Sequence, residues 1–327
     1  MFDEKNSIIL KKKYFYYLFS KNIIILFLIL FIQIDKYKNR IVKIDKINQI
    51  YYPSNFSGKN NIQKCYLSLD SSNIKIIHLI LTRFLMDFLS KSFSKNLYKE
   101  EYIRNGFRVM KKYLFPSLEN QSCKNFIWIL IIGNKANITY VKKSLNLNKN
   151  SFQSIVIYEK EIKNYVKKIS SGFDILITTR IDYDDRIYYD AVNDVRKAIN
   201  VNKPMNLYGY NRGFYFLENE GKYFDYYNNY GNQGAHGIFL SLILVLNKVN
   251  DSYTVYNLGD HGKIRKTLLK NYKLYGIKTL NYEPSFFDNG DPKFVYVSQN
   301  YSTRFRFKIN RKALKVNNFN LSKFYGK

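Results

Sequence analysis

Three aspartates occupy four consecutive positions directly after a short apolar run. The run is Ile175 to Thr178, and the carboxylates are Asp182, Asp184 and Asp185. Short apolar runs with β-branched residues are typical of buried strands, and open α/β sheets bind ligands beyond the carboxyl ends of their strands. Carboxylates this close repel one another unless a cation balances them, and such oxygen ligands suit Mg²⁺ or Mn²⁺ carrying a diphosphate. The residue types therefore predict a divalent-metal site.

A second interpretation of the same aspartates is structural. Asp-rich turns often cap the helix that follows, and Asp185 stands directly before Arg186–Tyr189. The strand-like run before the cluster favours the metal site over the cap.

The segment that holds the aspartates also resembles a known family. Residues 178–185 read TTRIDYDD, which is similar to the TTRLDnDD signature of a rhamnosyltransferase family with the nucleotide-diphospho-sugar glycosyltransferase fold called GT-A. Residues 81–84 read LTRF, similar to the end of that family's first strand, and residues 115–128 are similar to its lPSl.nQt..nF.W segment. The three blocks occur in the family's order, which makes them far more specific than an isolated D-x-D.

The resemblance implies a GT-A-like, Rossmann-type α/β fold and a sugar-nucleotide-dependent hexosyltransferase, with rhamnose as one candidate sugar. Its substrates would be a nucleotide-diphospho-sugar donor and an acceptor hydroxyl on a glycan or similar molecule. The expected ligands of the nucleotide and its diphosphate are Arg83, Arg180 and Asp182, although either arginine could instead serve a structural ion pair.

Candidates for the rest of the site lie in the C-terminal half. Enzymes of the resembled fold commonly complete the metal or diphosphate site with a histidine from this half, and His261 matches in order, with His236 as its competitor. The three candidates for the catalytic base are acidic and unranked: Asp260, Glu283 and Asp288. The third histidine, His78, lies within an apolar run and is expected in the core.

The periodicity along the chain predicts alternating strands and helices. Strands are expected over residues 74–82, 126–132, 153–158 and 174–179, and helices over 100–119, 159–169 and around Ile187–Ile199. Residues 205–210 and 214–216 suggest a hairpin, 238–245 a helix and 253–256 a strand. This order predicts an α/β fold with a mostly parallel central sheet covered by helices on both faces.

Composition divides the chain into four regions. Residues 23–32 are wholly apolar and follow Lys11–Lys13, which predicts an N-terminal hydrophobic helix over 1–35 that acts as an uncleaved, single-pass signal anchor. A polar stem over 36–72, a catalytic domain over 73–302 and a basic tail over 303–327 follow. The catalytic domain would lie C-terminal to the anchor, in the Golgi or endoplasmic reticulum lumen if the cell is eukaryotic.

The net charge of +28 does not by itself indicate a nucleic-acid partner. The chain is rich in Lys, Asn, Ile, Tyr and Phe together, as AT-rich codons dictate, and it carries no zinc-finger or helix-turn-helix motif. Its two cysteines, Cys65 and Cys123, would pair only in an oxidising compartment. Two other function classes stay open: a nucleotidyl- or phosphoryl-transfer enzyme that uses the same carboxylates, and a non-enzymatic, basic membrane-associated protein.

Overall fold

The computed structural model describes residues 74–86, 98–147, 150–210, 212–218, 220–227, 239–249, 251–258, 267 and 294–298. The chain divides into two compact units, Met1–Ile62 and Gln63–Lys327, and every described residue belongs to the second. The expected anchor, stem and basic tail all lie outside the described residues. Within the described ranges, no helix combines the length and apolar character needed to cross a bilayer.

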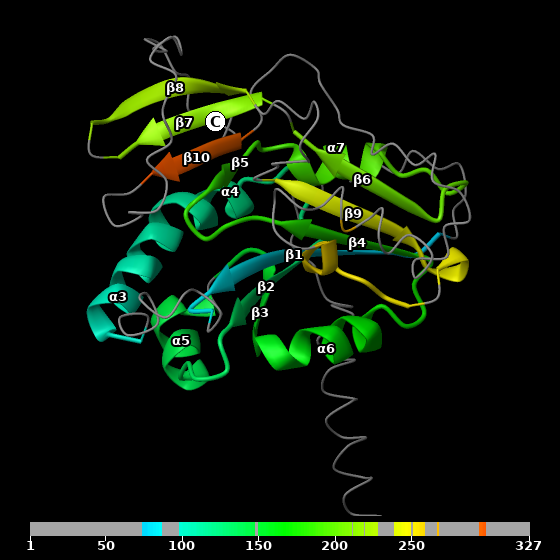
Figure 1. The fold of residues 1–327 in the computed structure, drawn as a ribbon, viewed down its shortest axis with the longest axis horizontal. Coiled ribbons are helices and arrows are strands. Elements are labelled where there is room, and N and C mark those ends of the chain that lie inside the picture. Colours follow the sequence, from blue (N-terminus) through cyan, green and yellow to red (C-terminus); the bar gives the residue numbers. More distant parts are fainter. Residues whose placement is uncertain are drawn as a thin grey trace, which may run out of the picture. The chain divides into compact units, whose positions relative to one another are not determined.

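A six-stranded sheet, here called the main sheet, forms the centre of the described unit. Its order is β3-β2-β1-β4-β9-β6 (Figure 1). Strands β1, β2, β3 and β4 pair in parallel, and β9 runs antiparallel to both β4 and β6. The strands are β1 (Ile76–Phe84), β2 (Ile127–Ile132), β3 (Gln153–Tyr158), β4 (Ile175–Arg180), β6 (Met205–Gly209) and β9 (Leu240–Val245). The α/β class with a mostly parallel central sheet is thereby confirmed.

The central strands are apolar along almost their whole length because both faces are covered. Every residue of β2, β4 and β9 is buried, the pattern of strands in covered parallel sheets. Polar groups within these strands satisfy one another. The buried His78 ring nitrogen Nε2 lies 2.7 Å from the hydroxyl of Thr179, which in turn lies 2.7 Å from the hydroxyl of Ser241. His78 is therefore a core residue, as expected.

The helices follow the strands in sequence, and their ends carry recognisable signals. Asn137 caps α5, its side-chain oxygen accepting from the Tyr140 N–H at 3.0 Å, and Asn146 ends that helix in the left-handed conformation. In Figure 1, α5 and α6 lie near the β3 edge of the main sheet and α7 near the β6 edge. The helices and turns are α3 (Glu100–Val109), the π-helical η1 (Met110–Leu114), α4 (Phe115–Glu119), α5 (Ile138–Leu145), η3 (Glu159–Glu161), α6 (Ile162–Ile169), α7 (Ala191–Lys197), η4 (Leu246–Lys248) and η5 (Val255–Leu258).

A second, four-stranded sheet, here called the small sheet, has the order β5-β10-β7-β8. Its strands are β5 (Arg186–Ile187), β7 (Arg212–Leu217), β8 (Lys222–Tyr227) and β10 (Phe294–Ser298). It packs against α3 and η1 through a cluster of Val109, Tyr113, Phe214 and Val295. The hydroxyl of Tyr113 also donates to the Glu218 carboxylate at 2.5 Å. The π-helical turn η1 thus connects α3 to the small sheet.

Four expected elements differ from the structure. Residues 205–210 and 214–216 do not form a hairpin, because β6 pairs with β9 in the main sheet and β7 pairs with β8 and β10 in the small one. Residues 240–245 form β9 instead of a helix, and 255–258 form a 3₁₀ turn instead of a strand. The helix expected around Ile187 begins only at Ala191, since residues 186–187 pair with β10.

A close approach between α3 and β1 depends on a glycine. A Cβ atom at Gly106 would lie 2.4 Å from Cε2 of Phe84, the last residue of β1. The Phe84 ring is itself held between two other rings, those of Phe107 at 5.5 Å and Tyr183 at 5.3 Å between centroids. The ring therefore has little room to move aside.

We expect Gly106→Ala to destabilise the fold. The substitution gains about 1 kcal/mol of helix propensity, but overpacking at such a contact costs about 1–3 kcal/mol, so the free energy of unfolding should fall by about 1 kcal/mol. Arg104→Ala on the same helix is the control, because its ion pair with Glu100 is exposed and contributes little. Thermal unfolding of both variants measures the difference. A Gly106→Ala protein as stable as the parent would contradict the close contact.

Candidate active site at the carboxyl edge of the main sheet

The three aspartates lie in a turn, here called the Asp loop (Asp182–Asp185), that carries the chain from the main sheet into the small sheet. Strand β4 ends at Arg180 and β5 begins at Arg186. The Asp185 N–H donates to the Asp182 carbonyl at 3.2 Å, which places Tyr183 and Asp184 at the corners of a reverse turn. The loop follows the carboxyl end of a parallel strand, where the sequence places the ligand site.

The three carboxylates have different environments. Asp182 and Asp184 are partly exposed, whereas Asp185 is fully buried next to the buried Arg186. The Asp182 carboxylate lies 3.6 Å from Nε of Arg180. Because Arg186 and Ile187 pair with β10, Asp185 does not cap a helix, and the capping interpretation is wrong.

The carboxylates of Asp182 and Asp184 repel each other. Burial raises the pKa of Asp184 from 3.8 to about 7, and the charge of Asp182 adds to the shift. A neighbouring carboxylate can raise a pKa only when the two negative charges lie close together. A divalent cation between them would relieve this repulsion.

Aromatic packing fixes one corner of the Asp loop. The Tyr183 phenol hydrogen-bonds with the Tyr102 phenol from α3, and burial raises the pKa of Tyr183 well above its usual value. Its ring contacts Phe84 at the end of β1. Tyr183 is therefore packed against the core, and its neighbour Asp184 is held at a defined position.

Two arginines from adjacent strands meet beside the loop. Arg83 lies near the end of β1 and Arg180 at the end of β4, where Arg180 is in register with Leu81. Their guanidinium carbons lie 3.7 Å and 5.2 Å from the centroid of one ring, that of Tyr256 in η5. Burial lowers the pKa of Arg83, and Asp182 is among the acidic groups that partly restore it. The structure thus brings together the three residues expected to bind the nucleotide and its diphosphate.

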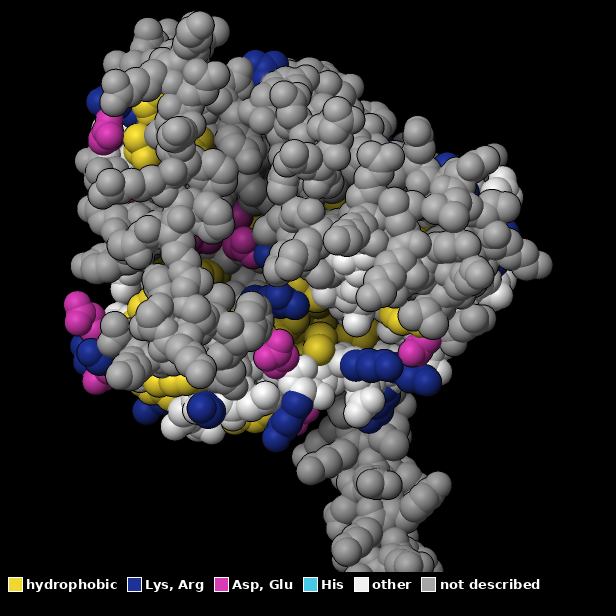
Figure 2. All heavy atoms as spheres, viewed as in Figure 1, with side chains coloured by type: hydrophobic (Ala, Val, Ile, Leu, Met, Phe, Trp, Pro, Cys, Tyr) yellow, Lys and Arg dark blue, Asp and Glu magenta, His cyan; other side chains and the backbone are white. Residues whose placement is uncertain are grey.

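Figure 2 shows acidic and basic side chains lying together in a hollow of one face.

The backbone at the carboxyl edge of the main sheet is also unusual. Leu85, directly after β1, has φ 55°, a left-handed conformation that is costly for a leucine. Such residues cluster at ligand-binding edges.

Gln121 holds the segment that follows the Asp loop. Its side-chain nitrogen donates to the carbonyls of Ser117 at 2.9 Å and Tyr188 at 2.8 Å, and its oxygen accepts from the Val192 N–H at 3.1 Å. The next residue, Ser122, donates its N–H to the Tyr189 carbonyl at 2.8 Å. The block similar to lPSl.nQt therefore supports the chain on the downstream side of the aspartates.

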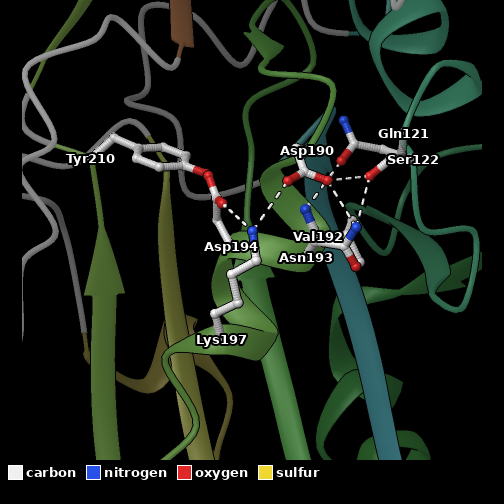
Figure 3. Close-up of polar contacts among 8 residues, drawn as sticks. All are labelled: Gln121, Ser122, Asp190, Val192, Asn193, Asp194, Lys197 and Tyr210. Carbon is white, nitrogen blue, oxygen red and sulfur yellow. Dashed lines mark hydrogen bonds and ion pairs between the residues drawn. The ribbon is translucent and has the colours of Figure 1, made fainter. Parts of the chain in front are cut away.

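Figure 3 shows how this support continues into α7. The Ser122 hydroxyl donates to the Asp190 carboxylate, which also accepts from Asn193 at 2.8 Å. Lys197 lies 3.4 Å from Asp190 and 3.5 Å from Asp194, and Asp194 accepts from the Tyr210 hydroxyl at 2.9 Å. These acidic groups are engaged in holding α7 to its neighbours, so they serve structure.

The residues fit an Mg²⁺ or Mn²⁺ ion that is shared with a substrate. Such ions typically bind through one or two carboxylates together with phosphate oxygens and water, and Asp182 and Asp184 can supply those carboxylates. The fully buried Asp185 is the least suited of the three. In the part of the chain that the structure describes, no group of three or more His, Cys, Asp or Glu side chains converges as a metal centre.

Several predicted site residues lie outside the described residues. They are the candidate metal ligand His261, its competitor His236, and the base candidates Asp260, Glu283 and Asp288. These assignments stay predictions. Cys123 is buried and disulfide-bonded, while the chain's other cysteine, Cys65, also lies outside the described ranges.

Two functional candidates were not foreseen from the sequence. Tyr256 belongs to a stretch that resembles a strand, and nothing in its neighbours signals that two arginines pack on its ring. Gln121 is present in the block quoted for the family resemblance, so its importance could have been inferred, but its partners at Tyr188 and Val192 could not.

The α/β fold places carboxylates and arginines at the carboxyl edge of its parallel strands, where open α/β sheets bind their ligands. The model of a family described as "Putative rhamnosyl transferase" matches residues 89–262. That match spans more than half of the chain, and the chain belongs to this family. The recognition made from the three sequence blocks is confirmed.

The solved structures found similar to this chain share little sequence identity with it and have low TM-scores. Staphylococcus aureus TarS 1–349 in complex with UDP is 11% identical, with a TM-score of 0.36, over 68% of this chain and 60% of that one. A protein described as "putative nucleotide-diphospho-sugar transferase from Desulfovibrio desulfuricans G20" is 11% identical, with a TM-score of 0.33, over 76% of this chain and 92% of that one. The inositol-1-phosphate CTP transferase of T. maritima is 11% identical, with a TM-score of 0.30, over 68% and 85%. No curated protein matches the sequence.

We expect the raised pKa of Asp184 to make stability fall as pH rises when no divalent ion is present. Between about pH 4 and pH 7 the folded state retains a proton that the unfolded state has lost, so the free energy of unfolding decreases across that window. Asp184→Asn should flatten this part of the pH profile, measured by urea unfolding in EDTA. Adding Mn²⁺ should stabilise the parent more at pH 8 than at pH 5. Parallel profiles for parent and variant would show that Asp184 does not titrate in this way.

We expect Gln121→Leu to destabilise the protein by about 2–4 kcal/mol, because the Tyr188 carbonyl and the Val192 N–H lose their partner in the interior. Asn120→Ala is the matched control, since it removes one local bond to the Pro116 carbonyl and should cost about 1 kcal/mol or less. Chemical denaturation of both variants measures the difference. Equal losses would mean that Gln121 does not hold the segment after the Asp loop.

Proposed function

We propose that this chain is a divalent-metal-dependent glycosyltransferase that moves a sugar from a nucleotide-diphospho-sugar donor to an acceptor hydroxyl. The observation that carries the proposal is the pair Asp182 and Asp184, held beside Arg180 at the carboxyl end of β4 in a chain of this family. Rhamnose is the sugar that the family's description suggests, and the acceptor would be a glycan or a similar molecule.

In this proposal Asp182 and Asp184 would hold a divalent ion. When bound, the ion would supply positive charge that offsets the negative charge growing on the leaving diphosphate. Arg180 adds a fixed guanidinium at the same edge, and Asp182 orients it. The sugar carbon passes through an oxocarbenium-like state, as in glycoside hydrolysis. These groups therefore act on the leaving group, the nucleoside diphosphate.

The acceptor side needs a base that removes the hydroxyl proton during attack. Asp260, Glu283 and Asp288 stay the candidates. Anchoring of the enzyme to a membrane through residues 1–35, with the catalytic domain C-terminal to the anchor, likewise stays a prediction.

The decisive measurement is a screen of divalent-ion-dependent donor hydrolysis across UDP-, GDP- and dTDP-sugars, rhamnose donors included. Release of the nucleoside diphosphate that requires Mn²⁺ or Mg²⁺ supports the proposal. Consumption of nucleoside triphosphates instead, with pyrophosphate released, would favour a nucleotidyltransferase that uses the same carboxylates. Activity toward neither class would leave the proposal without support and favour a non-enzymatic role.

We expect Asp184→Asn to fold and to lose donor turnover by about a hundredfold or more, because the carboxylate ligand of the ion is removed. The matched control is Asp174→Asn. Asp174 is exposed at the opposite end of β4, where its carboxylate accepts from the Lys75 N–H at 2.8 Å, and it should keep the parent's turnover. Initial rates at saturating donor compare the three proteins. An Asp184→Asn enzyme as active as the Asp174→Asn enzyme would refute the assignment.

A further inference from the structure

The side chain of Tyr256 contacts two arginines that come from different strands. The guanidinium carbon of Arg83 lies 3.7 Å from the ring centroid, which is a stacking distance, and that of Arg180 lies 5.2 Å away. Aromatic rings attract cations placed over their faces, more strongly where water is excluded. One ring therefore stabilises two like charges near each other at the end of the sheet.

The ring is fixed to both strands that carry these arginines. Its hydroxyl donates to the Leu81 carbonyl on β1 at 3.2 Å, and the preceding residue, Val255, donates its N–H to the Thr178 hydroxyl on β4 at 2.8 Å. Leu81 and Arg180 are partners in the strand register. Tyr256 is consequently tied to the same two strand ends whose arginines it contacts.

The chemistry of the two guanidiniums suits a ligand with two phosphate groups. Each guanidinium is a planar fork that binds phosphate oxygens in pairs, and a stacked guanidinium keeps its orientation. Both stand beside the Asp loop, and Asp182 lies 3.6 Å from Arg180. A diphosphate that also contacts an ion at Asp182 and Asp184 would reach both arginines.

We propose that Tyr256 is a positioning residue that aligns Arg83 and Arg180 as a clamp for the two phosphate groups of the donor's diphosphate. This inference rests on the proposed function and deepens it. The clamp binds a diphosphate through both guanidiniums and a single phosphate through one, so it selects the diphosphate. Tyr256 does not contact the reacting atoms and acts only through the two arginines.

The test is isothermal titration of the full-length chain with inorganic pyrophosphate and with inorganic orthophosphate, in buffer containing Mg²⁺. Tyr256→Leu removes the aromatic face, whereas Tyr256→Phe keeps the face and loses the hydrogen bond to Leu81. We expect pyrophosphate affinity to fall about tenfold in Tyr256→Leu, with most of it retained in Tyr256→Phe. The ratio of pyrophosphate to orthophosphate affinity should fall in the leucine variant, a change that a general loss of stability does not produce.

Two further variants keep the test decisive. Tyr140→Leu is the matched control, because the Tyr140 ring, in α5, packs on the Phe107 ring of α3 at a centroid distance of 6.2 Å and not on either arginine of the clamp, so this variant should bind pyrophosphate like the parent. Arg83→Met keeps most of the side-chain volume and removes one guanidinium. It should lose pyrophosphate selectivity even if Tyr256→Leu fails to fold.

The outcomes separate this inference from the proposed function. A folded Tyr256→Leu or Arg83→Met protein with the parent's pyrophosphate selectivity overturns the clamp. A parent chain that does not prefer pyrophosphate to orthophosphate overturns it as well. In either case, the glycosyltransferase proposal would stand if donor turnover still depended on Asp184. If turnover did not depend on Asp184 but pyrophosphate selectivity behaved as expected, the glycosyltransferase proposal would be weakened and the clamp would stand.

Discussion

The chain has to leave one sheet and join another between Arg180 and Arg186, and the candidate site depends on this crossing. Strand β4 is buried in the middle of the main sheet, and β5 pairs at once with β10 in the small sheet. Few residues are available for the change of direction, so they form a reverse turn. Side chains at such a turn cannot spread apart, and that is why carboxylates of like charge stay close together at the end of a parallel strand.

The surrounding elements act mainly to hold this turn. Tyr183 fixes one corner of the turn, because its ring packs on Phe84 of β1 and its phenol hydrogen-bonds with Tyr102 of α3. Gln121 fixes the downstream segment through the Tyr188 carbonyl, just after β5, and the Val192 N–H in α7. The π-helical turn η1 brings Tyr113 under the Arg186 guanidinium, whose carbon lies 4.5 Å from the ring centroid. Because these supports come from distant parts of the chain, the carboxylates have a defined geometry in advance of any ligand, which is the condition for electrostatic catalysis.

The edge of the sheet holds two pairs of like charges, and the ion pair between Arg180 and Asp182 joins one pair to the other. Burial and the nearby charge of Asp182 raise the pKa of Asp184, and two guanidiniums share one aromatic ring nearby. Each of these arrangements is costly when considered alone. A metal ion with a diphosphate would satisfy both, because it adds positive charge at the carboxylates and negative charge at the guanidiniums. One metal-bound diphosphate would thus offset the repulsion within both the carboxylate pair and the guanidinium pair, so the proposed function and the proposed clamp involve the same ligand.

The sequence by itself determined the apolar strands of the parallel half of the sheet and the position of the carboxylates after β4. These follow from local composition, since a strand covered on both faces must be apolar along its length. Tertiary structure decided whether residues 240–245 are a strand or a helix, because a short apolar run suits either until β4 and β6 offer it pairing partners on both sides. It also decided that Tyr256 meets Arg83 and Arg180. The contact with Arg83 joins residues 173 positions apart in the chain and that with Arg180 joins residues 76 positions apart, so no local pattern encodes either one.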